Sequence, residues 1–163
     1  MTAYNLEQTI VIRKLKTNEL SILTSLHDYE DVDEMLDSNK RRIENGEIDI
    51  FSLFEREKLV GELRVMYKHE DSLFTISGKR VYLYAFRIHI DFQGRGYGRQ
   101  LMDYVVGILK KEGYTEFTIG VEDDNDTAKL IYQSIGFTEL LSRQKEEYQG
   151  DSYEYNLYLK RSI

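Results

Sequence analysis

The stretch Gln93-Gly94-Arg95-Gly96-Tyr97-Gly98 places three glycines within five positions. It follows the most strand-like run of the chain, VYLYAFRIHI at 81–90, and precedes a helical pattern with apolar residues at Leu101, Val105, Ile108 and Leu109. Glycines allow the main chain to turn through conformations closed to other residues and allow a ligand to approach it closely. The amides of 95–99 are then expected to point outward at the positive end of the helix, where anions bind. A turn that only reverses the chain is the alternative.

The spacing of these glycines excludes two common phosphate-binding loops. A Walker A loop ends in Gly-Lys-Ser/Thr, whereas Gly98 is followed by Arg99-Gln100. A dinucleotide fingerprint requires G-x-G-x-x-G, and counting from Gly94 the last glycine position falls on Arg99.

Two blocks of the sequence resemble the GNAT N-acetyltransferase family. Gln93-x-x-Gly96-x-Gly98, after Ile88-His89-Ile90, is similar to the acyl-CoA pyrophosphate loop Q/R-x-x-G-x-G/A. Further on, Asn125-x-x-Ala128-x-x-Ile131-Tyr132-x-x-x-Gly136-Phe137 resembles the N-x-x-A-x-x-h-Y-x-x-x-G-F block of the same family. The resemblance covers roughly 81–137. It implies a mixed α/β (α+β) fold, with a mostly antiparallel central sheet of six to seven strands flanked by about four helices, in a single domain over 1–163.

The same resemblance implies acetyl-CoA as co-substrate and no metal. Amides around Arg95–Arg99 are expected to bind the pyrophosphate, and main-chain groups near Ile88 and Ile90 the pantetheine arm, inserted where the 81–90 and 115–121 strands splay apart. One amide near Ile88 is expected to polarise the thioester carbonyl. The complete predicted set of cofactor-binding residues is Ile88, His89, Ile90, Gln93, Gly94, Arg95, Gly96, Tyr97, Gly98, Arg99, Asn125, Ala128 and Tyr132.

For catalysis, the resemblance places Tyr132 near the cofactor sulfur, where a tyrosine can protonate a departing thiolate. The alternatives are that Tyr132 only packs against the cofactor and that Asn125 only caps a helix. An amine acceptor must lose a proton, and family members often use a carboxylate on the fourth strand, which is missing from 82–86. Glu62 is the first substitute, followed by Glu122 and His89. A second departure is Ile90, where the family often has proline.

Working outward, the remaining pattern predicts a simple order of elements. The expected elements are a strand at 9–15, two short helices within 17–45 broken near 28–31, a hairpin of 47–55 and 58–67, a loop at 68–79, strands at 81–90 and 115–121 each followed by a helix, and final strands at 137–142 and 153–160 joined by a polar stretch at 144–151.

The composition excludes several classes of protein. With 22 Lys and Arg against 29 Asp and Glu the net charge is −7, which argues against nucleic acid as the main partner. No apolar run approaches the length of a membrane span, and the first residues lack a secretory signal, so we expect a cytoplasmic protein without a membrane partner. The absence of cysteine excludes disulfides, zinc–thiolate sites and a cysteine acyl carrier.

Acidic residues cluster between the two early helices, which in this family border the acceptor site. This acidic segment comprises Asp28, Glu30, Asp31, Asp33, Glu34 and Asp37. It is either an attractor for a cationic amine or a solvated helix face. A homodimer is plausible, because edge strands late in such folds often pair.

The resulting functional hypothesis is an acetyl-CoA-dependent N-acetyltransferase. Because no cysteine can carry the acetyl group, a small-molecule or peptide primary amine is expected to attack directly in a ternary complex. Transfer of a longer acyl group is an alternative within enzymes. The missing carboxylate on the fourth strand also leaves open an acyl-CoA-binding sensor with little or no turnover. A purely structural domain would not bind CoA.

Overall fold

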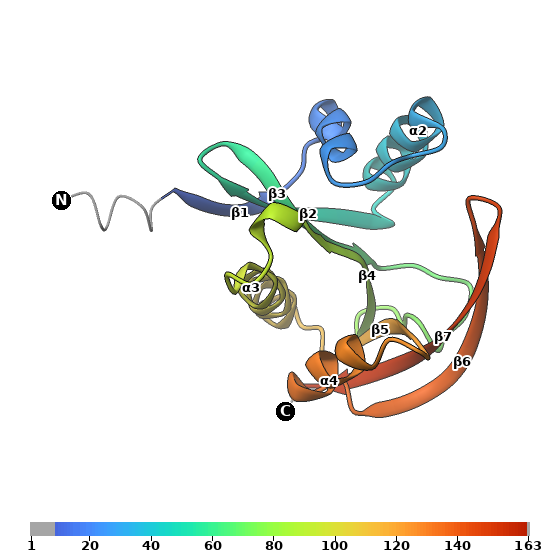
Figure 1. Ribbon diagram of the computed structural model, residues 1–163. Coiled ribbons are helices and arrows are strands. Elements are labelled where there is room, and N and C mark those ends of the chain that lie inside the picture. Colours follow the sequence, from blue (N-terminus) through green and yellow to red (C-terminus); the bar gives the residue numbers. More distant parts are fainter. Residues whose placement is uncertain (1–8, 163) are drawn as a thin grey trace. The chain divides into compact units, whose positions relative to one another are not determined.

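The computed structural model describes residues 9–162. Its elements follow the predicted order (Figure 1). They are β1 (Ile10–Lys14), the 3-10 helix η1 (Thr17–Ser25), α2 (Val32–Glu44), β2 (Ile48–Glu55), β3 (Lys58–Met66), β4 (Arg80–Ile88), the short 3-10 helix η2 (Ile90–Phe92), α3 (Tyr97–Lys111), β5 (Glu116–Glu122), α4 (Asp126–Ser134), β6 (Glu139–Tyr148) and β7 (Asp151–Arg161).

The strands form one sheet in the order β1-β2-β3-β4-β5-β7-β6. Strands β1 and β2, β5 and β7, and β6 and β7 pair antiparallel, whereas β4 and β5 pair parallel. The β4–β5 register runs only from Arg80↔Glu116 to Leu83↔Ile119, although β4 continues to Ile88. Ala85 then takes a positive φ of 50°, unusual for a residue with a side chain. The mixed, mostly antiparallel sheet and its helices confirm the predicted fold class.

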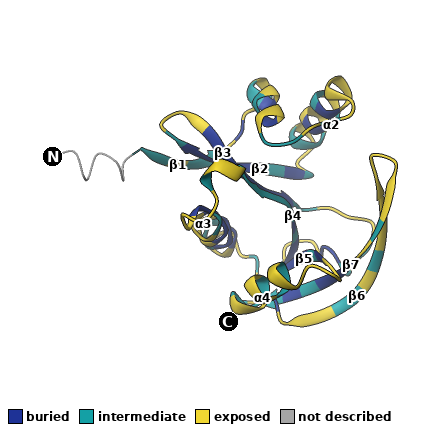
Figure 2. Cartoon of the chain, in the orientation of Figure 1, coloured by how far each residue is buried: buried dark blue, intermediate teal, exposed yellow. Residues whose placement is uncertain are grey.

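The described residues divide into two compact units, and β4 contributes to both. The first unit contains residues 9–65 and 85–108, and the second contains residues 66–84 and 109–162. The core of the first unit includes the fully buried Leu20, Leu23, Ile50, Leu53, Leu63 and Leu101. The core of the second includes Leu83, Leu109, Phe117, Phe137 and Leu157 (Figure 2). The expected single domain over 1–163 remains a prediction.

The predicted 56–57 turn is confirmed by its backbone. Arg56 and Glu57 both adopt positive φ, at 50° and 71°, which two-residue hairpin turns of the I′ type require. A second turn of this kind was not predicted. Gln149 and Gly150, with φ of 50° and 84°, connect β6 directly to β7.

The interpretation of 144–151 as a polar connection was therefore wrong. Most of it is strand, and β6 pairs with β7 from Glu139↔Leu159 to Tyr148↔Asp151. Strand β6 lies at the end of the sheet order, and most of its residues are exposed (Figure 2). Such a strand has no apolar face to reveal it, because neither face is buried.

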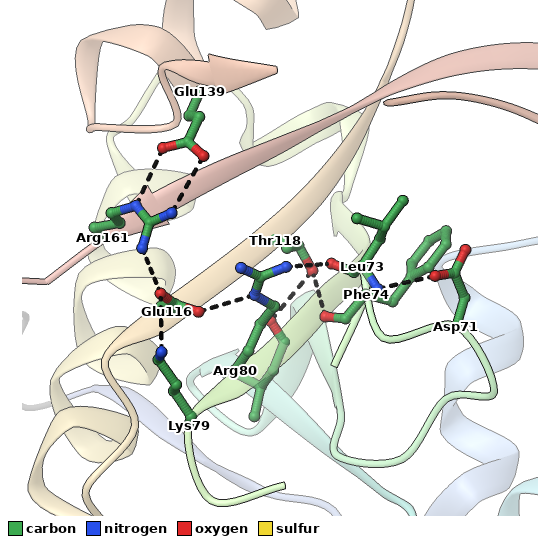
Figure 3. A network of polar contacts seen from close by, with 10 residues as sticks. Asp71, Leu73, Phe74, Lys79, Arg80, Glu116, Thr118, Glu139 and Arg161 are labelled. Carbon is green, nitrogen blue, oxygen red and sulfur yellow. Dashed lines mark hydrogen bonds and ion pairs between the residues drawn. The ribbon is translucent and has the colours of Figure 1, made fainter. Parts of the chain in front are cut away.

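A polar network fixes the second unit around Glu116 (Figure 3). Glu116 is only 3% exposed, and its carboxylate accepts from Arg80 Nε at 3.0 Å and from an Arg161 nitrogen at 2.6 Å. Arg80 also donates to the Leu73 carbonyl at 2.9 Å, and Thr118 Oγ1 donates to the Phe74 carbonyl at 2.9 Å. The network therefore holds the 69–79 loop against β4 and β5.

Candidate active site

The glycine turn lies in the first unit, between β4 and α3. Gly94 and Gly96 adopt φ of 80° and 83°, in the left-handed region that favours glycine. A side chain on either glycine would meet nothing within 4 Å. The conformation of the main chain, rather than a lack of space, therefore requires glycine at these two positions.

The main-chain amides of this turn are available to a ligand. The first helical hydrogen bond of α3 runs from the Gln100 amide to the Gly96 carbonyl at 3.1 Å. Within the described residues, the six amides from Gly94 to Arg99 form no hydrogen bond. They lie at the positive end of a 15-residue helix. The arrangement is suited to bind an anion with several oxygens, such as a diphosphate.

Side chains of the turn itself hold its entry in place. Gln93 Nε2 donates to the Ile88 carbonyl at 3.0 Å, and His89 Nδ1 accepts from the Asp91 amide at 3.1 Å. Ile90, in contrast, is 78% exposed. The predicted cofactor residues Gln93 and His89 thus have structural roles in the turn, and their side chains shape the main chain.

Two further residues of the turn are anchored to β2. The Tyr97 hydroxyl donates a short hydrogen bond to Glu55, and this contact raises the pKa of Tyr97. Arg95 lies 3.8 Å from the same carboxylate and its guanidinium stacks 4.9 Å from the centre of the Phe92 ring. Tyr97 is buried, so it acts as an anchor, whereas Arg95 remains half-exposed.

The last two residues of the turn region, Gly98 and Arg99, have ordinary surroundings. Arg99 pairs with Asp103 one helical turn further on at 3.2 Å, and both side chains are exposed. A Cβ on Gly98 would lie 3.4 Å from Phe86 and 3.7 Å from Ile88, which is ordinary contact. Space alone therefore does not require glycine at 98.

Sequence reasoning missed Gly61 on β3. A Cβ at this position would lie 2.7 Å from Ile88 Cδ1 and 3.3 Å from the Arg87 carbonyl. Gly61 thus allows β4 to approach closely at the residue expected to face the thioester. A glycine inside a strand pattern is the signal that could have identified it.

The second motif forms α4 in the second unit. Asn125 Oδ1 accepts from the Ala128 amide at 3.1 Å, so Asn125 caps the helix. Gly136 ends the helix with φ of 107°, and the following Phe137 is fully buried. Ala128 itself is half-buried. Much of this motif is therefore explained by the beginning and end of one helix.

Tyr132 is half-buried on α4 and contacts the Phe137 ring edge-on at 6.1 Å. Burial raises its pKa to about 12, so the hydroxyl keeps its proton at neutral pH. Tyr132 can therefore donate a hydrogen bond.

Glu62 is fully buried in the first unit between two arginines. Its Oε1 accepts from Arg87 at 2.6 Å and its Oε2 from Arg64 Nε at 3.2 Å. The side chain is 0% exposed. Each oxygen accepts one hydrogen bond from a guanidinium and keeps a second lone pair. Glu122, the second substitute, is exposed at the end of β5.

The acidic segment is largely explained by α2. Asp31 caps this helix by accepting from the Glu34 amide at 3.0 Å, and Asp33 and Glu34 lie in its first turn, where the helix dipole favours negative charge. Asp37 pairs with Arg41 at 3.5 Å on the exposed face. Attraction of a cationic amine remains a hypothesis beside this local role.

Residues 9–162 contain neither a membrane-spanning helix nor a cluster of metal-ligating side chains. No helix there is long and apolar enough to cross a membrane. No group of three or more His, Asp or Glu side chains in this part of the chain could hold a metal ion.

Similarity to known proteins agrees with the fold. The [Ribosomal protein bS18]-alanine N-acetyltransferase of Salmonella typhimurium is 32% identical over 62 residues, which are 38% of this chain and 42% of that protein. The chain thus matches less than half of the length of this curated relative.

Solved structures resemble nearly the whole chain. A probable acetyltransferase from Staphylococcus epidermidis has a TM-score of 0.73 at 20% identity, covering 94% of this chain and 99% of that one. A GNAT acetyltransferase from Elizabethkingia anophelis, solved with acetyl-CoA bound, has a TM-score of 0.66 at 14% identity, covering 94% and 98%. Residues 15–137, three quarters of the sequence, match the acetyltransferase (GNAT) family. The chain therefore belongs to the GNAT acetyltransferase family.

Proposed function

We propose that this protein is an N-acetyltransferase that moves an acetyl group from acetyl-CoA to a primary amine by direct attack in a ternary complex. The observation that carries the proposal is the run of six amides from Gly94 to Arg99 without hydrogen-bond partners at the N-terminus of α3. Family membership supplies the cofactor that such a run of amides fits.

The cofactor would be bound mainly by main-chain groups. The amides of 94–99 would hold its diphosphate, with the half-exposed Arg95 and the exposed Arg99 adding charge. Main-chain groups of 88–90 would hold the pantetheine arm, and Asn125, Ala128 and Tyr132 of the second motif are proposed to contribute to the same ligand. When bound, acetyl-CoA supplies a thioester carbon open to attack by a neutral amine.

Tyr132 would assist departure of the thiolate by donating a hydrogen bond. Its pKa of about 12 lies roughly 3.5 pH units above that of an ordinary thiol near 8.5. Complete proton transfer from Tyr132 is therefore uphill by about 5 kcal/mol. A hydrogen bond to the developing negative charge needs no such transfer, and this is the role that we propose for Tyr132.

A carboxylate or an imidazole would accept the proton of the amine. Glu62 stays the first candidate, because it is a carboxylate one strand away from the missing family carboxylate. Because the Glu62 side chain is 0% exposed, a water molecule would carry the proton to it. His89 and Glu122 are retained as the next candidates.

A small-molecule or peptide amine would be the acceptor. The curated relative acts on an alanine of ribosomal protein bS18, so a peptide with an N-terminal alanine belongs in the acceptor panel beside polyamines, aminoglycosides and lysine peptides. We propose a cytoplasmic protein without a nucleic-acid or membrane partner, and a homodimer through the exposed edge strand β6 is compatible with its place at the end of the sheet.

The assay that tests the proposal combines thiol release with the mass of the acceptor. At least one amine of the panel should gain 42 Da, the mass of an acetyl group, with one CoA thiol released for each acetyl group. Binding of CoA without release of thiol from any amine would instead favour the sensor. The absence of a carboxylate from 82–86 and the buried ion pairs of Glu62 favour keeping this second candidate.

A further inference from the structure

The buried carboxylate of Glu62 is outnumbered by its partners. Two guanidinium groups, Arg64 and Arg87, contact this one carboxylate on β3 and β4. The Glu62 side chain is 0% and the Arg64 side chain 8% exposed, whereas the Arg87 side chain is 27% exposed. Arg87 is therefore the one of these two guanidiniums that a ligand from the solvent can reach.

All three guanidinium nitrogens of Arg64 donate hydrogen bonds to protein groups. Its Nε donates to Glu62 at 3.2 Å, one terminal nitrogen to Asn39 at 3.3 Å and the other to the Tyr29 hydroxyl at 2.7 Å. These partners come from α2 and from the segment that precedes it. Arg64 therefore fixes the 27–39 segment against β3.

Arg87 uses only one of its nitrogens within the part of the protein that the structure describes. One terminal nitrogen donates to Glu62 at 2.6 Å, and within the described residues its guanidinium forms no other hydrogen bond or ion pair. The side chain is 27% exposed, so its remaining donors are accessible. Glu62 orients the guanidinium and leaves its other nitrogens to be used by a ligand.

The position of Arg87 in β4 places it next to the proposed reaction centre. The neighbouring Ile88 side chain points toward Gly61 and Gly98, at the start of α3. Successive side chains of a strand point to opposite faces, so Arg87 lies on the other face, with Glu62, Arg64 and Tyr29. This is the face covered by the segment between η1 and α2, which the family resemblance assigns to the acceptor.

His27 lies close to the same charged groups. Its ring contacts Tyr29 edge-on at 4.8 Å. Burial lowers the pKa of His27, and the charges of Arg87 and Arg64 lower it further, against the opposing effects of Glu62 and Asp28. The pKa of His27 therefore responds to both guanidiniums and to both carboxylates, so a new charge bound beside Arg87 should change it.

We infer that Arg87 binds a carboxylate of the acceptor, so that the preferred substrate carries an anionic group in addition to the amine that is acetylated. This inference rests on the proposed function. The carboxylate belongs either to a small amino acid or to a peptide, and both present the same planar pair of oxygens to the guanidinium. The inference also explains why an arginine with accessible donors is oriented by a buried carboxylate at this position.

The kinetic test uses acceptors that differ only in this charge. 4-Aminobutyrate and β-alanine are compared with their amides, and the dipeptide Ala-Gly with Ala-Gly-amide. We expect kcat/KM to favour the carboxylate by about tenfold or more, the size of one charge-assisted hydrogen-bonded contact. Arg87→Gln should remove the preference and Arg87→Lys should weaken it, whereas the exposed Arg41→Gln should retain it. Equal rates for acid and amide with the wild type would overturn the inference while leaving the acetyltransferase proposal intact.

If no acceptor of this set is acetylated, a binding measurement tests whether Arg87 contacts a carboxylate. The Arg87 Nε–H and the His27 ring are followed by NMR while N-acetyl-4-aminobutyrate or its amide is added to the CoA-bound protein. The carboxylate should shift the Arg87 signal and raise the pKa of His27, and the amide should do neither. Absence of any difference between the two probes would overturn the inference. Arg87→Lys retains a cation beside Glu62, so it provides a folded comparison if Arg87→Gln proves unstable.

Discussion

At the scale of single residues, the glycine turn was predictable and the arginine cluster was not. The positive φ of Gly94 and Gly96 follows from a glycine pattern read directly from the sequence. The contacts among Glu62, Arg64 and Arg87 depend on which strands become neighbours, which periodicity does not reveal. The one local clue was Glu62-x-Arg64, since alternate residues of a strand share a face.

Replacement of Tyr132 by phenylalanine tests its role toward the leaving group. Loss of one hydrogen bond to a developing negative charge should lower kcat by about 10- to 100-fold. CoA affinity, measured by calorimetry, should change less than about twofold, because the ring remains. An unchanged kcat would remove Tyr132 from catalysis.

The lowered pKa of His27 predicts a pH-dependent stability. The unfolded state binds a proton at His27 more readily than the folded state does, so stability from this residue is complete above pH about 6.5 and falls as the pH drops below it. Urea unfolding of the wild type and of His27→Gln should show a steeper loss for the wild type between pH 6.5 and 5. The slopes can differ by at most about 1.4 kcal/mol per pH unit. Parallel curves would contradict the assignment to His27.

At the scale of elements, the order of strands and helices was predicted, but the ends of the sheet were not. The apolar alternation of β2 and β3 and the helical period of α2 and α3 arise from burial of one or both faces. Strand β6 is exposed along most of its length, so its polar residues resembled a connection. The acidic segment was likewise ambiguous, because Asp31, Asp33 and Glu34 suit a helix start as well as a binding surface.

Glu116 and Glu139 both contact Arg161, but their replacement is expected to lower the free energy of unfolding by different amounts. Glu116→Gln leaves the buried Arg80 without its charged partner and should lower the free energy of unfolding by about 3 kcal/mol. Glu139→Gln removes an exposed, solvent-screened contact to Arg161 and should lower the free energy of unfolding far less. Chemical denaturation of both variants measures the difference. Equal costs would contradict the structural role of Glu116.

The end of α4 provides a matched pair of glycines. Gly136 and Gly113 have φ of 107° and 102°, so alanine is strained at both. Only at Gly136 would the added Cβ collide, at 2.6 Å from Lys160 Nζ, which donates to the Ile135 carbonyl. Gly136→Ala should therefore destabilise by roughly 1 kcal/mol more than Gly113→Ala, because the partly buried Ile135 carbonyl loses a charged donor. Thermal or urea unfolding compares them, and equal losses would show that backbone strain alone is decisive.

At the scale of the whole molecule, membership of the family rests on most of the chain, whereas the proposed reaction rests mainly on the amides of residues 94–99. Residues 15–137 match the family, but the residues expected to perform chemistry are few and depart from its pattern on β4. What the sequence predicted best is the part held by main-chain groups, because a glycine pattern directly encodes main-chain conformation. What it predicted least is the acceptor, whose contacts are made by side chains from distant segments.

The most direct measurement is calorimetry of CoA with the wild type, Gly96→Trp and Gly46→Trp. Gly46 is a matched control, since its φ is 73° against 83° for Gly96 and a Cβ at either position meets nothing within 4 Å. Both tryptophans are strained alike, but only that at 96 would cover the amides at the start of α3. We expect heat of binding for the wild type and for Gly46→Trp, and none for Gly96→Trp. Binding of CoA by Gly96→Trp with unchanged affinity, or no heat with the wild type, would show that these amides are not the site of the CoA diphosphate.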